Sequence, residues 1–132
     1  MTQTGGMFMK LLLLSDVHGN TDVLDRLDDE FKCCDAVLFA GDFAECFKTE
    51  TAKPVLDKLS KKHDTIFAVL GNCDEPSFIE ELEDADMNCE KTLVFHEGLS
   101  FCGSGGGSKF TGTIPNERTE EELLSDFDVI KN

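Results

Sequence analysis

Three short polar clusters contain residues that could bind a metal ion: Asp16 and His18 in SDVHGN, Asp42 in AGDF and Asn72 in LGNCDE. Each cluster follows a short apolar run, and a glycine directly precedes Asp42 and Asn72. Residues two positions apart on an extended segment point to the same side, so Asp16 and His18 could converge on one ion. Carboxylate and amide oxygens combined with an imidazole favour Mn, Fe or Zn over Ca or Mg.

Each cluster has an ordinary structural interpretation when it is taken alone. A single Asp-x-His at a strand end is more often a solvated loop or a capping group, and Gly-Asp or Gly-Asn is usually a turn. Their occurrence in order at three successive predicted strand ends instead favours a shared metal site.

The elements that must position these residues alternate between strand and helix. Apolar runs predict strands at 8–15, 35–41 and 65–71, and amphipathic patterns predict helices from Asn20 or Thr21 to Phe31, at 51–63 and at 76–86. This order is typical of a parallel sheet in an α/β fold, whose ligands bind at the carboxyl ends of the strands. The continuous apolar character of 8–15 predicts a strand buried on both faces.

The pattern changes after this region. Residues 91–103 predict a hairpin that turns at Glu97-Gly98, and a helix is expected at 119–127, where Thr119 and Glu122 form a capping-box signature. The last residues, 128–130, predict another strand. The glycine-rich segment 103–108 lacks the Gly-Lys-Ser/Thr ending of a phosphate-binding P-loop, so a flexible connection is the preferred interpretation. Residues 1–8 are expected to be a disordered tail, and 9–132 a single domain.

Composition limits the classes of partner. The 132 residues include 27 acidic and 12 basic side chains, for a formal charge of −15. Non-specific binding to nucleic acid or to anionic membranes requires clustered Lys and Arg and is not expected. An acidic chain can still bind phosphate esters if it carries cations. The apolar run after Lys10 is too short for a secretory signal or a membrane span.

The cysteines indicate a reducing compartment. Six cysteines are present without a Cys-x-x-Cys pair, which predicts small buried thiols and no disulfide framework. We therefore expect a cytoplasmic protein.

The three polar clusters resemble, in order and spacing, the first three signature blocks of the calcineurin-like metallophosphoesterases. The similarity is to the branch of small bacterial and archaeal phosphodiesterases, and FCGSGGGSKFTGTIPNERTEEEL also resembles that branch. The resemblance implies the N-terminal part of the family's α/β sandwich, in which helices flank mixed sheets. It also implies two divalent metals, with Mn favoured over Fe or Zn. Asp16 and His18 would bind the first, Asp42 would bridge both, and Asn72 would bind the second.

The implied reaction is hydrolysis of a phosphodiester or phosphomonoester, in which a hydroxide bridging the two metals attacks phosphorus. The family's usual third block has histidine where this chain has Cys73. A neutral thiol is a poor acid compared with imidazole, so Cys73 is not assigned a catalytic role beyond weak support. Asp74 is expected to fix the loop and Asn72.

The family also supplies metal ligands from two later histidine blocks, the first after a strand resembling FDVI, and this chain ends before them. Neither His63 nor His96 matches a family ligand position. The domain is therefore expected to be incomplete at its C-terminus and the second metal to bind weakly. A second polypeptide or self-association could complete the site. The alternative is a catalytically inactive remnant that binds a metal or a partner.

Overall fold

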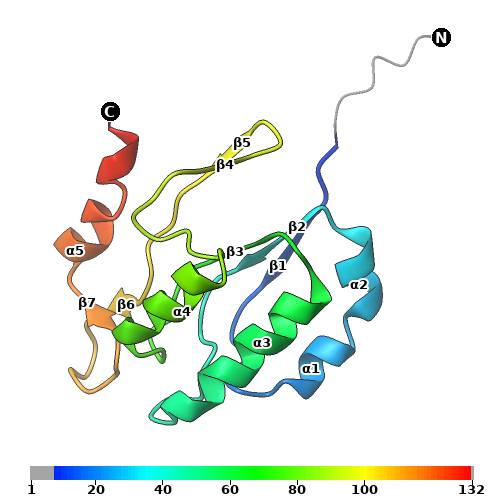
Figure 1. Ribbon diagram of the computed structural model, residues 1–132. Coiled ribbons are helices and arrows are strands. Elements are labelled where there is room, and N and C mark those ends of the chain that lie inside the picture. Colours follow the sequence, from blue (N-terminus) through cyan, green and yellow to red (C-terminus); the bar gives the residue numbers. More distant parts are fainter. Residues whose placement is uncertain (1–7, 132) are drawn as a thin grey trace.

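Three parallel strands form the central sheet of the computed structural model, which describes residues 8–131 (Figure 1). Their order is β1-β2-β3, and their bounds are Leu11–Leu14, Ala36–Phe39 and Ile66–Ala68. Leu14 pairs with Phe39 and Phe39 with Ala68, so the three strands end at the same level. This common edge is where the sequence places the polar clusters. Of the tail expected at residues 1–8, residues 1–7 lie outside the described residues, as does the terminal Asn132.

Helices lie over one face of this sheet (Figure 1). They are α1 (Asp22–Asp25), α2 (Asp28–Cys33), α3 (Ala52–Lys62) and α4 (Ile79–Asp84). Short 3-10 turns, η1 (Thr49–Thr51) and η2 (Pro76–Phe78), lead into α3 and α4. The core between helices and sheet includes Leu24, Phe31, Val37, Phe39, Val55, Leu59 and Leu82.

The single helix expected between residues 20 and 31 is instead two short helices. Leu27, with φ −109° and ψ 18°, interrupts the helical backbone. The acidic residues that follow occupy the first turn of α2, where the helix dipole favours negative charge. Leu24 and Phe31 are both buried, so the break keeps the predicted apolar face on the core.

The opposite face of the sheet is only partly covered. The predicted hairpin is present as β4 (Val94–His96) and β5 (Leu99–Phe101), and its turn residues Glu97 and Gly98 have φ of 50° and 79°. Phe101 stacks on Phe67 of β3 with ring centroids 4.7 Å apart. Over β1, however, Leu13 remains 69% exposed, so the expectation of a strand buried on both faces is wrong there.

The C-terminal region contains a second parallel pair. β6 (Gly107–Ser108) pairs with β7 (Glu117–Arg118), and α5 (Glu120–Ser125) begins at Thr119, whose side chain accepts the Glu122 N–H at 3.1 Å. The strand expected at 128–130 is wrong. Those residues form the 3-10 turn η3 (Asp128–Ile130), because the chain after α5 keeps bonding to carbonyls three residues back, as in Ile130 N–H to Phe127 O at 3.0 Å.

The glycine-rich segment is held by hydrogen bonds rather than forming a free connection. Gly103 N–H donates to Cys89 O at 2.7 Å, and Gly106 N–H donates to Leu70 O at 2.8 Å. A Cβ at position 107 would lie 3.0 Å from Cβ of Asn72, so glycine permits this close approach. The segment therefore packs against the loop that follows β3. In the part of the chain that the structure describes, no helix is long and apolar enough to cross a membrane.

A buried ion pair joins this segment to α5. Both guanidinium NH2 groups of Arg118 bond to the Asp126 carboxylate, one of them at 2.8 Å. Arg118 also donates to Gly105 O at 3.0 Å, and Ser104 donates its hydroxyl to Asp126 at 2.8 Å. The Asp126 side chain is fully buried, so the pair contributes to the fold only while Asp126 is charged.

Loss of the Asp126 charge is expected to destabilise the fold in a pH-dependent way. The hydrogen bonds from Arg118 hold the pKa of the Asp126 carboxyl below its usual value, against the effect of burial. Because the folded pKa is the lower one, the stabilisation is present above the unfolded pKa of about 3.9 and is lost as pH falls through the folded pKa. Asp126→Asn should cost about 3 kcal/mol of unfolding free energy at pH 7.

Urea unfolding at pH 7 and at successively lower pH measures this effect. The difference between wild type and Asp126→Asn should shrink below about pH 4, where the wild-type carboxyl is also becoming neutral. The exposed Asp128, which pairs with Lys131, provides a control as Asp128→Asn. A stability difference independent of pH would contradict the assignment.

Candidate metal centre

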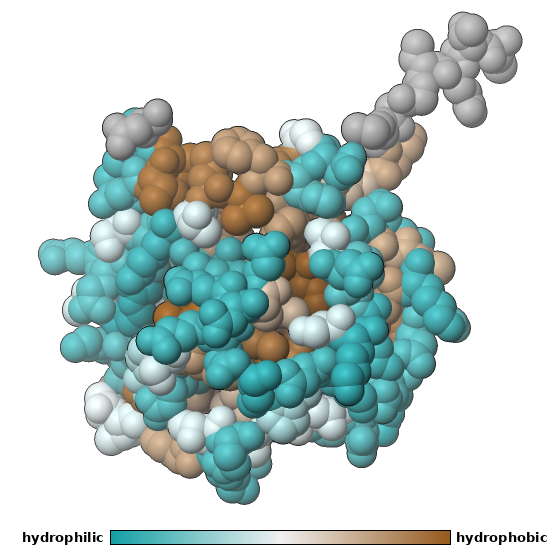
Figure 2. Space-filling view, in the orientation of Figure 1, coloured by the Kyte–Doolittle hydropathy of each residue, from teal (hydrophilic) through white to brown (hydrophobic). Residues whose placement is uncertain are grey.

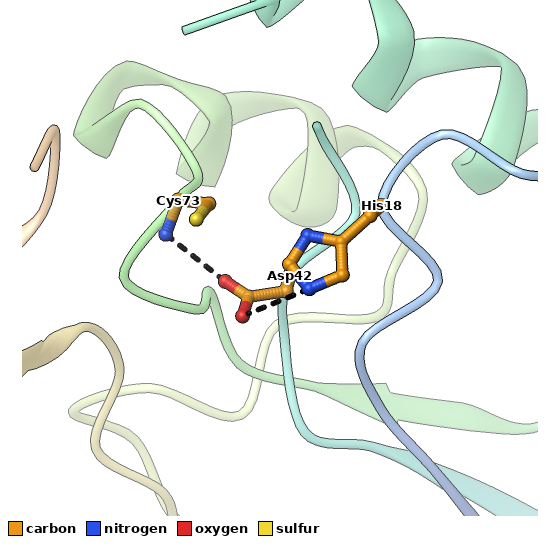
Figure 3. A group of neighbouring side chains, drawn as sticks. All are labelled: His18, Asp42 and Cys73. Atoms are coloured by element: carbon orange, nitrogen blue, oxygen red, sulfur yellow. Dashed lines mark hydrogen bonds and ion pairs between the residues drawn. The ribbon is translucent and has the colours of Figure 1, made fainter. Parts of the chain in front are cut away.

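Side chains from the loops after all three strands meet at the carboxyl edge of the sheet. His18 follows β1, Asp42 follows β2 and Cys73 follows β3, and one potential ligand atom from each lies within 4.8 Å of the others (Figure 3). Asp16 joins them, since its Oδ1 is 3.4 Å from Nε2 of His18. A carboxylate, an imidazole and a sulfur therefore lie within the reach of one cation, and a second carboxylate lies beside the imidazole.

The His18 ring is oriented by a backbone carbonyl. Nδ1 lies 3.1 Å from the carbonyl oxygen of Ala44. A carbonyl only accepts hydrogen bonds, so this contact places a proton on Nδ1. In the neutral ring Nε2 then presents a lone pair to Asp16 and to Asp42, whose Oδ2 is 3.7 Å away. A bound cation would stabilise this convergence of lone pairs, and the donor set therefore fits a divalent transition metal.

Three of these residues have a left-handed backbone. The φ angles are 60° at Asp16, 47° at His18 and 60° at Asp42. This region is unfavourable for residues other than glycine, at a cost of about 1–2 kcal/mol each, although Asp tolerates it better than most. Such strain is retained where the surrounding structure imposes it, and it gathers at functional sites.

Asp74 connects the loop after β2 to the loop after β3. Its buried carboxylate accepts backbone N–H groups from Asp42 at 2.9 Å, Phe43 at 3.2 Å, Ala44 at 2.8 Å and Gly71 at 2.8 Å. The first of these holds the Asp42 backbone, and the third holds the residue whose carbonyl orients the His18 ring. One carboxylate therefore positions the supports of two potential ligands.

The two glycines of the clusters are required by close packing. A Cβ at Gly71 would lie 1.9 Å from Oδ1 of Asp42. Gly41 has φ +92°, and a Cβ there would lie 2.3 Å from the Gly71 nitrogen. Both glycines allow the loops after β2 and β3 to approach closely enough for Asp42 to accept the Cys73 N–H at 3.0 Å.

The carboxyl groups of the site differ in their ionisation. Hydrogen bonding from the Ser15 hydroxyl lowers the pKa of the Asp16 carboxyl, and contacts with Asp42 and His18 lower it further. Burial raises the pKa of the Asp42 carboxyl, as do the charges of Asp74 and Asp16, whereas the hydrogen bond from the Cys73 N–H opposes these effects. The environment of Asp42 therefore disfavours its charged form, and a bound cation would offset this effect.

A family model for the calcineurin-like phosphoesterase superfamily domain matches residues 9–122. The chain belongs to this superfamily. Over 128 residues, 95% of its length, it is 31% identical to the uncharacterized protein MJ1162 of Methanocaldococcus jannaschii. It spans 56% of that relative, about half of its length. The mixed α/β fold, with parallel and antiparallel sheets flanked by helices, agrees with the family and confirms the predicted fold class.

One residue predicted as a metal ligand, Asn72, is not among the three side chains whose ligand atoms lie within 4.8 Å of one another. Asn72 is in the same loop as Gly71 and Cys73, and its carbonyl accepts the Asn116 N–H at 3.0 Å. Its side chain is a ligand only by prediction. His63 bonds to Cys34 O at 3.0 Å, and His96 belongs to β4.

The expectation that all six cysteines are reduced thiols is wrong for two of them. Cys46 and Cys73 form a disulfide, with Cα atoms 4.6 Å apart and a separation of 27 positions in the sequence. Cys46 lies in the loop after β2, which folds back through a bridge between Glu45 and Lys48. Asp74 draws this loop onto the one that carries Cys73, so the pairing depends on tertiary contacts rather than on a recognisable spacing. The remaining cysteines, 33, 34, 89 and 102, are free.

Two features of the candidate metal centre were missed by sequence reasoning. Nothing in the sequence marks the Ala44 carbonyl as the partner of His18. The pairing of Cys46 with Cys73 was also missed, and no spacing signal could have found it. Both depend on the loop 42–48, which has no regular secondary structure before η1.

Proposed function

We propose that this chain is a metal-dependent phosphoesterase whose ions are held by Asp16, His18, Asp42 and Asn72. The observation that carries the proposal is the orientation of His18, which directs Nε2 toward two carboxylates at the carboxyl edge of the sheet. Membership of the superfamily supports metal-dependent hydrolysis of phosphate esters. Phosphodiesters and small phosphomonoesters are the proposed substrates.

The proposed cofactor is a pair of divalent transition metals, with Mn favoured over Fe or Zn. When bound, the metals would supply a hydroxide nucleophile bridging them and would stabilise charge on the phosphoryl oxygens. The chain's own part is to position its ligands, with Ala44 orienting His18 and Asp74 holding both loops. Asp42 is the proposed shared ligand. Asn72 is the proposed further ligand of the second metal.

A partner is the proposed source of further ligands, either a second polypeptide or a second copy of this chain. Figure 2 shows hydrophobic side chains gathered along one edge of the molecule, close to the C-terminal turn. Large hydrophobic residues exposed on the surface include Leu13, Phe95, Leu124, Phe127, Val129 and Ile130. Exposed apolar surface of this kind supports association. The acidic composition argues against nucleic acid as the partner.

A cytoplasmic location also remains a proposal. The absence of a disulfide framework supports it, whereas the disulfide between Cys46 and Cys73 weakens that support. A disulfide that forms reversibly would be compatible with a reducing compartment.

The function is tested by hydrolysis of bis(4-nitrophenyl) phosphate and of 4-nitrophenyl phosphate with added Mn²⁺, with and without a reductant. We expect metal-dependent hydrolysis by the wild type and a reduction of about 100-fold in His18→Ala, which loses the oriented imidazole. His96→Ala is the matched control, because His96 lines a separate pocket with Asp35 and Thr65, which precede β2 and β3. It should retain wild-type activity.

Two outcomes would overturn parts of this assignment. Hydrolysis that survives His18→Ala would place the reaction at another site. A chain that binds Mn²⁺, Fe²⁺ or Zn²⁺ through His18 and yet hydrolyses neither ester would instead be the inactive metal-binding remnant, the alternative considered from the sequence.

A further inference from the structure

The disulfide lies at the candidate metal centre itself. Cys73 contributes its sulfur to the group of atoms within 4.8 Å that includes His18 and Asp42, and its N–H donates to Oδ1 of Asp42 at 3.0 Å (Figure 3). The same sulfur is bonded to Cys46. One atom is thus placed both to bind a cation and to form a covalent bond with a second cysteine.

We propose that the Cys73 thiolate is a ligand of the metal held by His18 and Asp42, and that its disulfide with Cys46 withdraws this ligand. Metal binding would then depend on the redox state of the two thiols. This inference rests on the proposed metal site and adds to it a ligand and a form of regulation.

The thiolate and the disulfide of Cys73 differ in their ability to bind a metal. A thiolate is a strong, soft ligand for Zn, Fe and Co, whereas a disulfide sulfur carries no negative charge and is a poor ligand. Oxidation joins two thiols through one S–S bond and releases two protons and two electrons, which a small-molecule disulfide accepts as it is reduced to two thiols. A dithiol reductant reverses the reaction and becomes a disulfide itself.

The two loops that carry the disulfide are also joined by contacts that do not involve its sulfur atoms. Asp74 holds the loops after β2 and β3 together through backbone N–H groups of Asp42, Phe43, Ala44 and Gly71. Reduction therefore frees the Cys73 sulfur while its loop stays beside Asp42. Oxidation changes the ligand set without requiring movement of His18, which is held by Ala44.

The exposure of the pair and the state of the other cysteines favour a reversible bond over a permanent cross-link. Cys46 and Cys73 are both partly exposed, which allows a small thiol or disulfide to reach them. The other cysteines of the chain, all of which lie within residues 8–131, are free. A single disulfide among free thiols differs from the framework of paired cysteines in small secreted domains.

Cobalt(II) binding tests the proposal directly, because a thiolate ligand adds a sulfur-to-cobalt charge-transfer band to the spectrum. The wild type is titrated with Co²⁺ after oxidation, with the Cys46–Cys73 cross-link verified by peptide mass mapping, and again after reduction by a phosphine. We expect the band only after reduction, with an affinity about 10- to 100-fold higher than in the oxidised protein.

Three variants separate the roles of the two sulfurs. Cys46→Ser cannot form the disulfide, so it should show the band and the higher affinity without a reductant. Cys73→Ser should bind Co²⁺ weakly and without the band in either condition. Cys33→Ser, which removes an exposed free thiol, should behave like the wild type.

The proposal is overturned if the reduced wild type binds Co²⁺ without the band, or if oxidised and reduced protein bind it with equal affinity. Failure of the proposed function would give other results than failure of the redox switch. Hydrolysis that is lost in His18→Ala but unaffected by reduction would leave the phosphoesterase assignment intact and remove the switch. A redox-dependent cobalt band without hydrolysis of either ester would support the switch and remove the enzymatic function.

Discussion

Replacement of Asp42 by asparagine is expected to lower the affinity for Mn²⁺ by about 100-fold and the kcat/KM of ester hydrolysis by about 1000-fold. Asp42 links the loop after β1 to the loop after β3, since one of its oxygens accepts the Cys73 N–H at 3.0 Å and the other lies 3.7 Å from Nε2 of His18. The substitution removes the anionic ligand and preserves volume. Asparagine also tolerates the left-handed backbone found at this position.

The same substitution is expected to leave the metal-free fold intact or to stabilise it by about 1 kcal/mol. Burial and the neighbouring charges of Asp74 and Asp16 raise the pKa of the Asp42 carboxyl, which means that the environment disfavours its charged form. A neutral amide relieves that repulsion. An increase in unfolding free energy together with a decrease in metal affinity would indicate that Asp42 is retained for the metal rather than for the fold.

Isothermal titration with Mn²⁺ and urea unfolding without metal measure the two effects. Asp86→Asn is the matched control, because Asp86 is an exposed aspartate with a similar left-handed backbone, φ 56°, and it lines a separate pocket with Thr65 and His96. It should change neither property by a measurable amount. Wild-type Mn²⁺ affinity in Asp42→Asn would rule out Asp42 as a ligand.

The parts of the structure that could be predicted from the sequence are those set by local pattern. The apolar runs ending before Asp16, Asp42 and Asn72 became three parallel strands whose ends are level, because hydrophobic runs and glycine turns act within a few residues. The hairpin turn at Glu97-Gly98 likewise depends on its own two residues.

Features that depend on tertiary contacts could not be predicted. The left-handed backbone at Asp16, His18 and Asp42 is imposed by neighbouring loops, and the residue types at these positions do not predict it. The Cys46–Cys73 bond exists because Asp74 brings two loops together, so counting cysteine spacings gave the wrong answer. In both cases the decisive contacts join residues about 30 positions apart.

The errors in secondary structure have a similar origin. Asp128, Val129 and Ile130 have a strand-like composition, but the chain leaving α5 continues to turn and forms η3. The exposure of Leu13 reflects the position of the hairpin, which packs on β3 through Phe67 and leaves the face over β1 open. The sequence pattern indicates which secondary structure a segment favours, and its tertiary contacts decide which structure it adopts.

Removal of the Asp74 carboxylate is expected to be the most destabilising single substitution at the site. Asp74→Ala leaves four backbone N–H groups without their acceptor, those of Asp42, Phe43, Ala44 and Gly71. Hydrogen bonds to a charged group are worth about 1.5–3 kcal/mol each, and entry of water offsets part of the loss. We expect a decrease in unfolding free energy of about 4 kcal/mol, a large fraction of what a domain of this size has.

Asp74→Asn keeps the size of the side chain and part of its hydrogen bonding, whereas Asp74→Ala removes both. Oδ2 of Asp74 accepts three of these N–H groups and Oδ1 accepts the fourth, so Asp74→Asn can keep the first set while its NH2 group faces the Ala44 N–H. Its destabilisation should therefore be about half that of alanine. Metal affinity should fall in both variants, because Ala44 no longer holds the His18 ring in place.

Urea unfolding and Co²⁺ titration of the two variants, with the exposed Asp84→Ala as the control, decide whether Asp74 positions the site. If it does, stability and metal affinity should decline together in the order wild type, Asp74→Asn, Asp74→Ala. A stable Asp74→Ala protein with wild-type metal affinity would show that the loops after β2 and β3 keep their positions without the Asp74 carboxylate. Asp74 bonds to backbone N–H groups and not to the ligand atoms, so it can influence metal binding only by positioning the two loops. Asparagine keeps part of this hydrogen bonding and should therefore retain part of the metal affinity.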